Sequence, residues 1–319
     1  MGAAQHLPTE PAACALCGPG PLRAHAAGED FEYRTSDDHW HMRRCGRCGL
    51  LVLTPRPTAD QFDRIYPPGY HAFAFTPERF GLAHAVRRRL EATRLLRAFA
   101  GLPARARILD VGCGDGFHLG LLREFGRPGW ELLGVDPSER ATRRAAGAGL
   151  TVRVGTVETL PAADGRFDAA LMVMTVEHLA DPLATVRAVR DRLTPGGRLV
   201  VVTDDAGSPD AHLFGRRHWG GYHFPRHTYL FDRRTLRRLG ERAGFRVRQV
   251  RTLVSPVNWV YSVRNTLVDA GGPGWLIDRL SLESAAALAA GTVLDFACQL
   301  LGHGAVLQAV FVNPGERPA

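Results

Sequence analysis

Four cysteines near the amino terminus are spaced as ligands for one metal ion. Cys14 and Cys17 form one C-x-x-C pair, and Cys45 and Cys48 form a second. A glycine follows each pair and permits the tight backbone turn that brings two thiolates to the same ion. Four protein thiolates complete a tetrahedral site and leave no position for water or substrate, so we predict a structural Zn²⁺ in a zinc ribbon. Folding of this region should then depend on the metal.

Two alternatives to this zinc site remain open at the level of sequence. The four cysteines could be free or disulfide-linked, and His39 or His41 could replace one of them as a ligand. The two remaining cysteines, Cys113 and Cys298, stand alone, so the six cysteines do not follow the spacing of a secreted disulfide framework. The first residues carry no basic start followed by an apolar run, and we therefore expect no signal peptide and a cytoplasmic protein.

A glycine-rich turn flanked by carboxylates is the second motif that could do chemistry. The run from Ile108 to Gly116 contains three glycines, with Asp110 before the turn and Asp115 within it. Glycines allow the backbone to approach a ligand closely, and a carboxylate at this place suits a cationic part of the ligand better than a pyrophosphate. Asp136 ends the next apolar run, where an acidic side chain can accept the hydroxyls of a ribose. A different nucleotide-binding protein of the same fold is the alternative.

This assembly resembles the class I S-adenosylmethionine-dependent methyltransferases. The similarity continues in order through residues 155–161, 167–170, 177–178 and 193–197. Thr156 departs from the pattern, because many family members have an acidic residue there that contacts the adenine amino group. The resemblance implies S-adenosylmethionine as cofactor, with the amino-acid end at the turn, the ribose at Asp136 and the adenine near Val157. The cofactor-binding residues that it implies are Asp110, Gly112, Cys113, Gly114, Asp136, Val157 and Glu158.

A segment rich in histidine and aromatic residues follows the fifth predicted strand. Residues 218–231 contain three histidines, two tyrosines and one arginine. The carboxyl edge of a parallel sheet is where ligands bind, so this segment suits an acceptor lid that carries a general base. The catalytic candidates, in order, are His227, His223 and His178, with Tyr222 as an orienting group. A structural hydrogen bond is the alternative for each histidine, and Arg226 could bind an anionic acceptor or form a salt bridge within the protein.

The elements that must position these residues follow from alternating apolar patterns. Short apolar runs alternate with helical stretches from residue 107 onward, which is typical of a doubly wound α/β protein with a parallel sheet. With the resemblance, we expect a Rossmann-like seven-stranded methyltransferase sheet, an N-terminal zinc ribbon and a helical insertion before the last strand. Expected strands are 107–111, 131–136, 152–154, 167–174, 198–202, 245–254 and 305–312. Expected helices are 82–100, 117–125, 138–148, 182–193 and 233–243.

We expect three parts along the chain of 319 residues. These are a zinc ribbon (1–57), a helical connector (58–104) and a methyltransferase domain (105–319) with an irregular acceptor lid (204–231) and an apolar insertion (256–303). The apolar stretch 285–301 is shorter than the roughly 20 residues that span a bilayer, so no transmembrane helix is predicted. It suits core packing or a homodimer contact, and a lipidic acceptor or a peripheral membrane contact is the alternative.

The formal net charge of +8 first suggests an anionic partner, but all 40 cationic residues are arginine, a bias typical of a GC-rich genome. Residues 210–251 hold eleven arginines against three acids, so the excess gathers in and just beyond the lid. We predict transfer of a methyl group from S-adenosylmethionine to a small-molecule acceptor, with an anionic acceptor as one option, by an in-line substitution that a histidine assists. Sugar methyltransferases that act on nucleotide-linked deoxysugars carry a similar ribbon, and their further C-terminal domain, which is not found in residues 1–319, is a departure that weakens the sugar expectation. The expected acceptors are a nucleotide sugar or a secondary metabolite.

Two other functions remain open. An RNA base methyltransferase is the second enzyme hypothesis, although the ribbon arginines are not interleaved with aromatic residues as an RNA platform would favour, and we expect no nucleic acid partner. A non-catalytic cofactor-binding or scaffold protein is the third.

Overall fold

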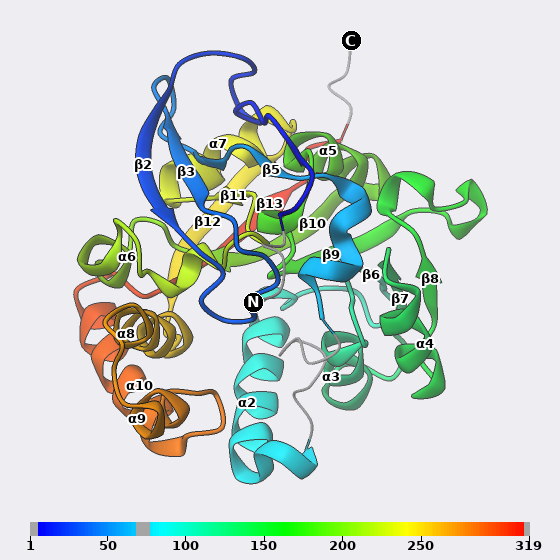
Figure 1. Ribbon diagram of the computed structural model, residues 1–319. Coiled ribbons are helices and arrows are strands. Elements are labelled where there is room, and N and C mark those ends of the chain that lie inside the picture. Colours follow the sequence, from blue (N-terminus) through cyan, green and yellow to red (C-terminus); the bar gives the residue numbers. More distant parts are fainter. Residues whose placement is uncertain (1–5, 68–76, 316–319) are drawn as a thin grey trace.

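A seven-stranded sheet organises the computed structural model, which describes residues 6–67 and 77–315 (Figure 1). The strands lie in the order β12-β13-β10-β9-β6-β7-β8. All run parallel except β13, which is antiparallel to both of its neighbours. The predicted α/β class and the seven strands are confirmed. The strands are β6 (Arg107–Val111), β7 (Glu131–Asp136), β8 (Val152–Val154), β9 (Phe167–Val173), β10 (Leu193–Asp204), β12 (Arg246–Leu253) and β13 (Val306–Val312).

Helices cover both faces of this sheet, which is why its central strands are apolar at consecutive positions. On β6, Ile108 packs with Leu95 and Leu122 on one face, while Leu109 shares the opposite core with Val186 and Leu236. Neighbouring residues of a strand point to opposite faces, so both must be apolar when both faces are covered. The helices concerned are α2 (Pro77–Ala98) and α3 (Phe117–Phe125) on one side and α5 (Pro182–Arg192) and α7 (Arg233–Arg242) on the other; α4 (Glu139–Gly147) follows β7.

Side-chain caps fix the starts of three of these helices. Ser138 accepts a hydrogen bond from the backbone of Ala141 at the start of α4, and Asp181 caps α5. Asp232 forms a capping box with Thr235 at the start of α7. Such caps satisfy backbone N–H groups that have no partner inside the helix. These three helices lie within one or two residues of their predicted bounds.

A second sheet of four antiparallel strands carries the amino-terminal region, in the order β11-β4-β3-β2. Three strands come from the predicted ribbon, namely β2 (Leu22–Gly28), β3 (Trp40–Cys45) and β4 (Leu51–Leu53). The fourth, β11 (Tyr229–Leu230), is the end of the lid segment, residues 204–231. The lid and the ribbon thus share one sheet. A separate pair joins β1 (Thr9–Glu10) to β5 (Arg56–Pro57), and the short helix α1 (Phe62–Ile65) follows.

Several predicted elements differ from the structure. Strand β10 begins at Leu193 and reaches Asp204, because its first residue pairs with Phe167 before a register shift. The lid is not irregular throughout, since it contains α6 (Pro209–Phe214), a 3₁₀ turn (Gly220–Tyr222) and β11. Helix α2 begins at Pro77 and has a non-helical residue at Gly81. The insertion consists of three helices, α8 (Val257–Asp269), α9 (Gly274–Arg279) and α10 (Ala285–Leu300), which lie together at the lower left of Figure 1.

Candidate functional site

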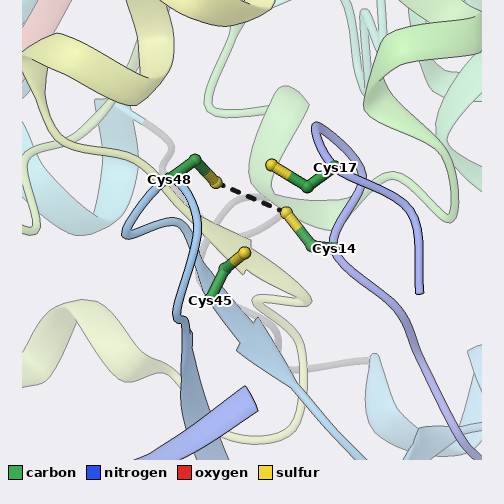
Figure 2. Close-up of side chains that lie close together, drawn as sticks. All are labelled: Cys14, Cys17, Cys45 and Cys48. Carbon is green, nitrogen blue, oxygen red and sulfur yellow. Dashed lines mark hydrogen bonds between the residues drawn. The ribbon is translucent and has the colours of Figure 1, made fainter. Parts of the chain in front are cut away.

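The four ribbon cysteines converge on one point. Figure 2 shows their thiols directed toward one another from two loops. All four sulfur atoms lie within 4.8 Å of one another, and the Cys14 and Cys48 sulfurs are 3.5 Å apart. A tetrahedral Zn²⁺ with Zn–S bonds of about 2.3 Å would separate its sulfurs by about 3.8 Å, so the residues fit this ion. The glycines that follow the pairs, Gly18 and Gly49, adopt φ of 69° and 88°, as the turns require.

The chemistry of the thiols also fits a divalent cation. None of the cysteines is in a disulfide. Burial raises the pKa of Cys14 and brings that of Cys48 to about 11, so these two are neutral thiols when no cation is near. For Cys45, backbone N–H groups of Arg47 and Cys48 outweigh burial and lower the pKa to about 7. The histidine alternative finds no support, because the clustered group contains cysteines alone and His39 contacts Glu29.

The glycine-rich turn joins β6 to α3 and is held by the neighbouring strand. Gly112 and Cys113 donate backbone hydrogen bonds to the carbonyl of Val135, at 2.8 and 3.2 Å. Gly112 has a φ of 74°, and a Cβ there would lie 2.4 Å from Cγ2 of Thr175. Gly114 also has a positive φ of 54°, but a Cβ there would have nothing within 4 Å, so this side of the turn is open. The turn therefore combines a packed wall with an accessible backbone, as a ligand cradle needs.

Two carboxyl groups lie at this turn and differ in their hydrogen bonding. Asp136 accepts hydrogen bonds from the backbone of Gly114 at 2.9 Å and of Ser138 at 2.8 Å, which fixes its orientation at the end of β7. Asp110 is 1% exposed, and its Oδ2 is buried without a hydrogen-bond partner. Burial, and secondarily the charge of Asp136, raises the pKa of Asp110 to about 8. An unpaired buried carboxyl beside an open turn fits a ligand that brings a positive charge.

The remaining predicted cofactor residues differ in how far their side chains are exposed to solvent. Cys113 is buried, and its sulfur packs where a Cβ on Gly134 would be 2.7 Å away. Val157 is fully buried at the start of a 3₁₀ turn, while Glu158 beside it is exposed and accepts a hydrogen bond from Thr185 at 2.7 Å. Val157 therefore offers an apolar wall at the edge of β8, and Glu158 is held toward α5.

The structure brings the three candidate histidines together. The ring centroids of His178 and His227 are 4.7 Å apart, and those of His223 and His227 are 5.0 Å apart. We call these three residues the histidine cluster. His178 ends the turn after β9, and the other two come from the lid, so the cluster forms where the parallel strand β9 ends.

Backbone carbonyls lie against Nδ1 of two cluster members. Nδ1 of His227 lies 2.8 Å from the carbonyl of Gly221, and Nδ1 of His178 lies 3.1 Å from the carbonyl of Arg226. A carbonyl can only accept, so Nδ1 of His227 carries the proton and its Nε2 keeps a lone pair. Nδ1 of His178 also lies 2.8 Å from the Tyr66 hydroxyl, which can donate, so these contacts do not fix the tautomer of His178. Burial lowers the pKa of His178 to about 4 and that of His227 well below its usual range. Both rings are therefore neutral near pH 7 and able to accept a proton.

Two buried carboxyl groups lie against the cluster. Glu177, next to His178, accepts a hydrogen bond from Thr203 at 2.8 Å, and its other oxygen is buried without a partner. Burial, then the charge of Asp204, raises the pKa of Glu177 to about 8. Burial likewise raises the pKa of Asp204 to about 7, although Asn258 donates to it. Asp204 lies 3.8 Å from Nδ1 of His227, a distance for charge interaction rather than a hydrogen bond.

Two predicted lid residues have partners inside the protein. The hydroxyl of Tyr222 donates to the carbonyl of Gly215, and its ring stacks on Phe224 at 5.1 Å, which favours packing over orientation of an acceptor. Arg226 is 1% exposed and forms a salt bridge with Asp30, so the salt-bridge alternative holds and its guanidinium is not available to an anionic acceptor.

Sequence reasoning missed several residues of this site. The hydroxyl of Tyr66 lies 2.8 Å from Nδ1 of His178, and Glu32 lies 2.7 Å from Nδ1 of His223. Asp204 and Asp30 were not singled out either. Only Glu177 had a signal, as the neighbour of His178 in the family-like segment 177–178. The other four come from loops or strand ends whose spacing carries no recognisable motif.

The surface of the insertion is apolar. Helix α10 and the residue after it expose Val293, Leu294, Phe296, Leu300 and Leu301. Within the described residues, no helix has both the length and the apolar character needed to cross a bilayer.

The chain is similar to known methyltransferases. A family model described as a methyltransferase domain matches residues 82–250. A ubiquinone biosynthesis O-methyltransferase from Cereibacter sphaeroides is 43% identical over 103 residues, covering 30% of this chain and 40% of that protein. One from Ruegeria pomeroyi is 31% identical over 191 residues, covering 52% of this chain and 69% of that protein. A methyltransferase structure from Archaeoglobus fulgidus, titled as SAM-dependent, has 19% identity and a TM-score of 0.47 over 70% of this chain and 94% of its own. The chain spans about two fifths of the length of the Cereibacter relative.

Proposed function

Because the chain belongs to the methyltransferase domain family, whose model matches residues 82–250, we propose that it transfers a methyl group from S-adenosylmethionine to a small-molecule acceptor. The observation that carries this proposal is the unpaired, buried carboxyl of Asp110 beside the open glycine turn. When bound, S-adenosylmethionine supplies an electrophilic methyl group on a positively charged sulfonium. Asp110 would hold the cationic amino-acid end, Asp136 the ribose hydroxyls, and Val157 the adenine.

The histidine cluster provides the proton acceptor in this proposal. His178 and His227 are neutral, and His227 keeps a lone pair on Nε2 because its Nδ1 donates to the carbonyl of Gly221. Glu177 and Asp204 lie against them and, when ionised, balance the positive charge that a protonated imidazole brings into a buried site. We place His227 first, because it lies between the other two rings and nearest to Asp204.

The acceptor in this proposal is a small molecule with an acidic hydroxyl. A base is needed where the acceptor must lose a proton as the new bond forms. The names of the relatives, ubiquinone biosynthesis O-methyltransferases, support an oxygen acceptor of low molecular weight. Arg226 is engaged by Asp30 and Arg217 by Glu29 and Asp269, so these lid arginines give no support to an anionic acceptor.

The cysteine quartet is proposed to hold one structural Zn²⁺. It is supported by the fit of four clustered sulfurs to a tetrahedral ion. The packing of Cys14, Cys45 and Cys48 in one core with Tyr229 and Phe231 connects this ion to the lid. In this proposal the metal stabilises the sheet that the lid joins and takes no part in methyl transfer.

Transfer of a radioactive methyl group tests the proposed function. The purified full chain is incubated with S-adenosylmethionine labelled in the methyl group and a panel of catechols, phenolic acids and nucleotide-linked sugars. Label is expected in a phenolic product with the wild type and to fall by at least about 100-fold with His227→Gln. Label found instead in structured RNA would favour the RNA methyltransferase and contradict the proposal.

A further inference from the structure

The loop between β2 and β3, residues 29–39, reaches across to the lid. Two of its carboxylates contact lid side chains and are almost completely buried. The side chains of Asp30 and Arg226 are 1% and 0% exposed, and those of Glu32 and His223 are 7% and 5% exposed. Charged side chains are seldom buried unless they are paired, so these contacts are specific features of the interface between ribbon and lid.

Asp30 organises its own loop and binds the lid at the same time. Its two oxygens accept hydrogen bonds from the backbone of Tyr33 and Thr35, each at 3.0 Å. The same oxygens accept from both terminal nitrogens of Arg226, at 3.1 and 2.8 Å, in a bidentate arrangement. The Tyr33 ring lies 4.5 Å from the guanidinium carbon of Arg226, in a cation–π contact. A rigid loop therefore holds the guanidinium on two sides.

Arg226 in turn connects three parts of the chain. Its Nε donates to the carbonyl of Ile65 at 2.6 Å, and its Nη1 donates to the carbonyl of Phe224 at 2.8 Å. Its own carbonyl lies 3.1 Å from Nδ1 of His178, which the Tyr66 hydroxyl also contacts at 2.8 Å. The Asp30–Arg226 pair thus positions a backbone hydrogen-bond acceptor beside His178.

Glu32 acts on the third ring of the histidine cluster. Its Oε1 lies 2.7 Å from Nδ1 of His223, within the range of a charge-assisted hydrogen bond. As an ionised carboxylate Glu32 can only accept, and we then expect Nδ1 of His223 to carry the proton. His223 also adopts a φ of 42°, a left-handed conformation that is unfavourable for a residue with a side chain and needs support from its surroundings. Glu32 and the Tyr33 ring, whose centroid is 6.0 Å from that of His223, provide this support.

We propose that Asp30 and Glu32 of the ribbon are positioning residues for the transferase, because they fix Arg226 and His223 and thereby the arrangement of the histidine cluster. The inference rests on the proposed function, in which this cluster serves the acceptor. It assigns the ribbon a part in the active site beyond folding. Neither carboxylate acts on the acceptor; each acts through the lid side chain that it holds.

Nuclear magnetic resonance of the full chain, with ¹⁵N-labelled histidine rings and bound S-adenosylhomocysteine, tests this inference. The ring ¹⁵N shifts distinguish the two neutral tautomers, and His223→Asn assigns the signal of His223. In the wild type we expect His223 to be protonated at Nδ1 with a preference of more than about tenfold. In Glu32→Gln this preference falls severalfold, because an amide can donate as well as accept, and the signal of the neighbouring His227 shifts with it.

Glu29→Gln is the matched control, because Glu29 lies in the same loop but contacts Arg217 and His39. It should leave the His223 signal unchanged. Asp30→Glu and Asp30→Asn test the second contact, and we expect the His178 signal to change more in the Asn variant, since Glu keeps the charge that pairs with Arg226. An Nε2-protonated His223 in the wild type, or identical spectra for wild type and Glu32→Gln, would overturn the inference.

The affinity for S-adenosylhomocysteine separates this inference from the proposed function. We expect all loop variants to bind it within about twofold of the wild type, because no hydrogen bond or ion pair joins turn residues 112–116 to loop residues 29–39, all of which the structure describes. If no protein, wild type included, binds it, the proposed function fails, while the tautomer of the unliganded protein still decides the positioning role. If Glu32→Gln loses both cofactor binding and dispersed spectra, the protein has unfolded, and Glu32→Asp is measured instead. This variant keeps the charge but shortens the reach of the carboxylate. A His223 signal like that of the wild type in Glu32→Asp would overturn the positioning role of Glu32.

Discussion

Arg226 and Asp30, which are 196 positions apart in the sequence, form a bidentate ion pair at 3.1 and 2.8 Å in the buried interface between lid and ribbon. This pair, together with strand β11 in the ribbon sheet, makes the amino-terminal region and the lid one structural unit. The stability of the lid should therefore depend on residues far from the methyltransferase core.

Loss of the Asp30 charge should destabilise the protein strongly. Asp30→Asn leaves the Arg226 guanidinium buried without its counter-charge, so we expect the free energy of unfolding to fall by about 3–5 kcal/mol. Urea unfolding measures this change. Glu10→Gln is the control, because its partner Arg56 forms a half-exposed pair, and we expect a loss of less than about 1 kcal/mol. Equal losses of unfolding free energy in the two variants would show that the buried pair contributes no more to stability than the half-exposed pair.

Cofactor affinity should depend on pH through Asp110. Its pKa of about 8 means that the folded protein without ligand keeps this carboxyl protonated at neutral pH, whereas a cationic ligand favours the ionised form. We expect the affinity for S-adenosylmethionine to rise from pH 6 to about pH 8, by at most about tenfold per pH unit, and then to level off. Asp110→Asn should bind more weakly at pH 8 and lack this rise. Calorimetry measures this affinity over the pH range. An affinity of the wild type that does not change with pH would contradict the role of Asp110.

The same carboxyl lowers the stability of the protein without ligand as the pH rises. The unfolded chain releases the Asp110 proton near its ordinary value of 3.8, but the folded chain holds it until about pH 8. The folded state binds more protons between these values, so the free energy of unfolding contributed by this group decreases from about pH 4 to pH 8. Denaturant unfolding at several pH values should show a smaller decrease for Asp110→Asn than for the wild type.

Substitution of Gly112 should impair the cofactor turn. In Gly112→Ala the new Cβ would lie 2.4 Å from Cγ2 of Thr175, and the φ of 74° is unfavourable for alanine. We expect a loss of about 1–3 kcal/mol in unfolding free energy and at least tenfold weaker cofactor binding. Gly120→Ala in helix α3 has nothing within 4 Å and should be neutral or stabilising by up to about 1 kcal/mol. Unchanged cofactor binding in Gly112→Ala would exclude close packing at this turn.

Metal analysis tests the cysteine quartet. We expect one zinc ion per chain, its loss in Cys45→Ser, and a fall of several kcal/mol in unfolding free energy when it is removed by a chelator. Cys298→Ser on α10 is the control and should keep the metal, because this cysteine lies outside the cluster. A wild-type protein that folds with the same stability in the presence of a chelator would contradict a structural metal.

The sequence permitted prediction of the elements whose signals are local. The apolar runs around Ile108 and Leu133 give the bounds of β6 and β7, and the Gly-Cys-Gly turn between them needs only backbone conformation to be recognised. The contacts of Asp30 and Glu32 with the lid could not be predicted, since 196 and 191 positions separate the partners and no periodic pattern connects them. The pairing of β11 with the ribbon sheet could not be predicted either, because a strand of two residues is too short to show an alternating pattern.

Isothermal titration of the full chain with S-adenosylmethionine, for wild type and Asp136→Ala, tests the central claim most directly. Asp136 is held by Gly114 and Ser138 in the position where a ribose would be recognised. We predict saturable binding of one molecule by the wild type and at least about tenfold weaker binding by Asp136→Ala. Absence of binding by the wild type, or equal affinity for both proteins, would contradict the account.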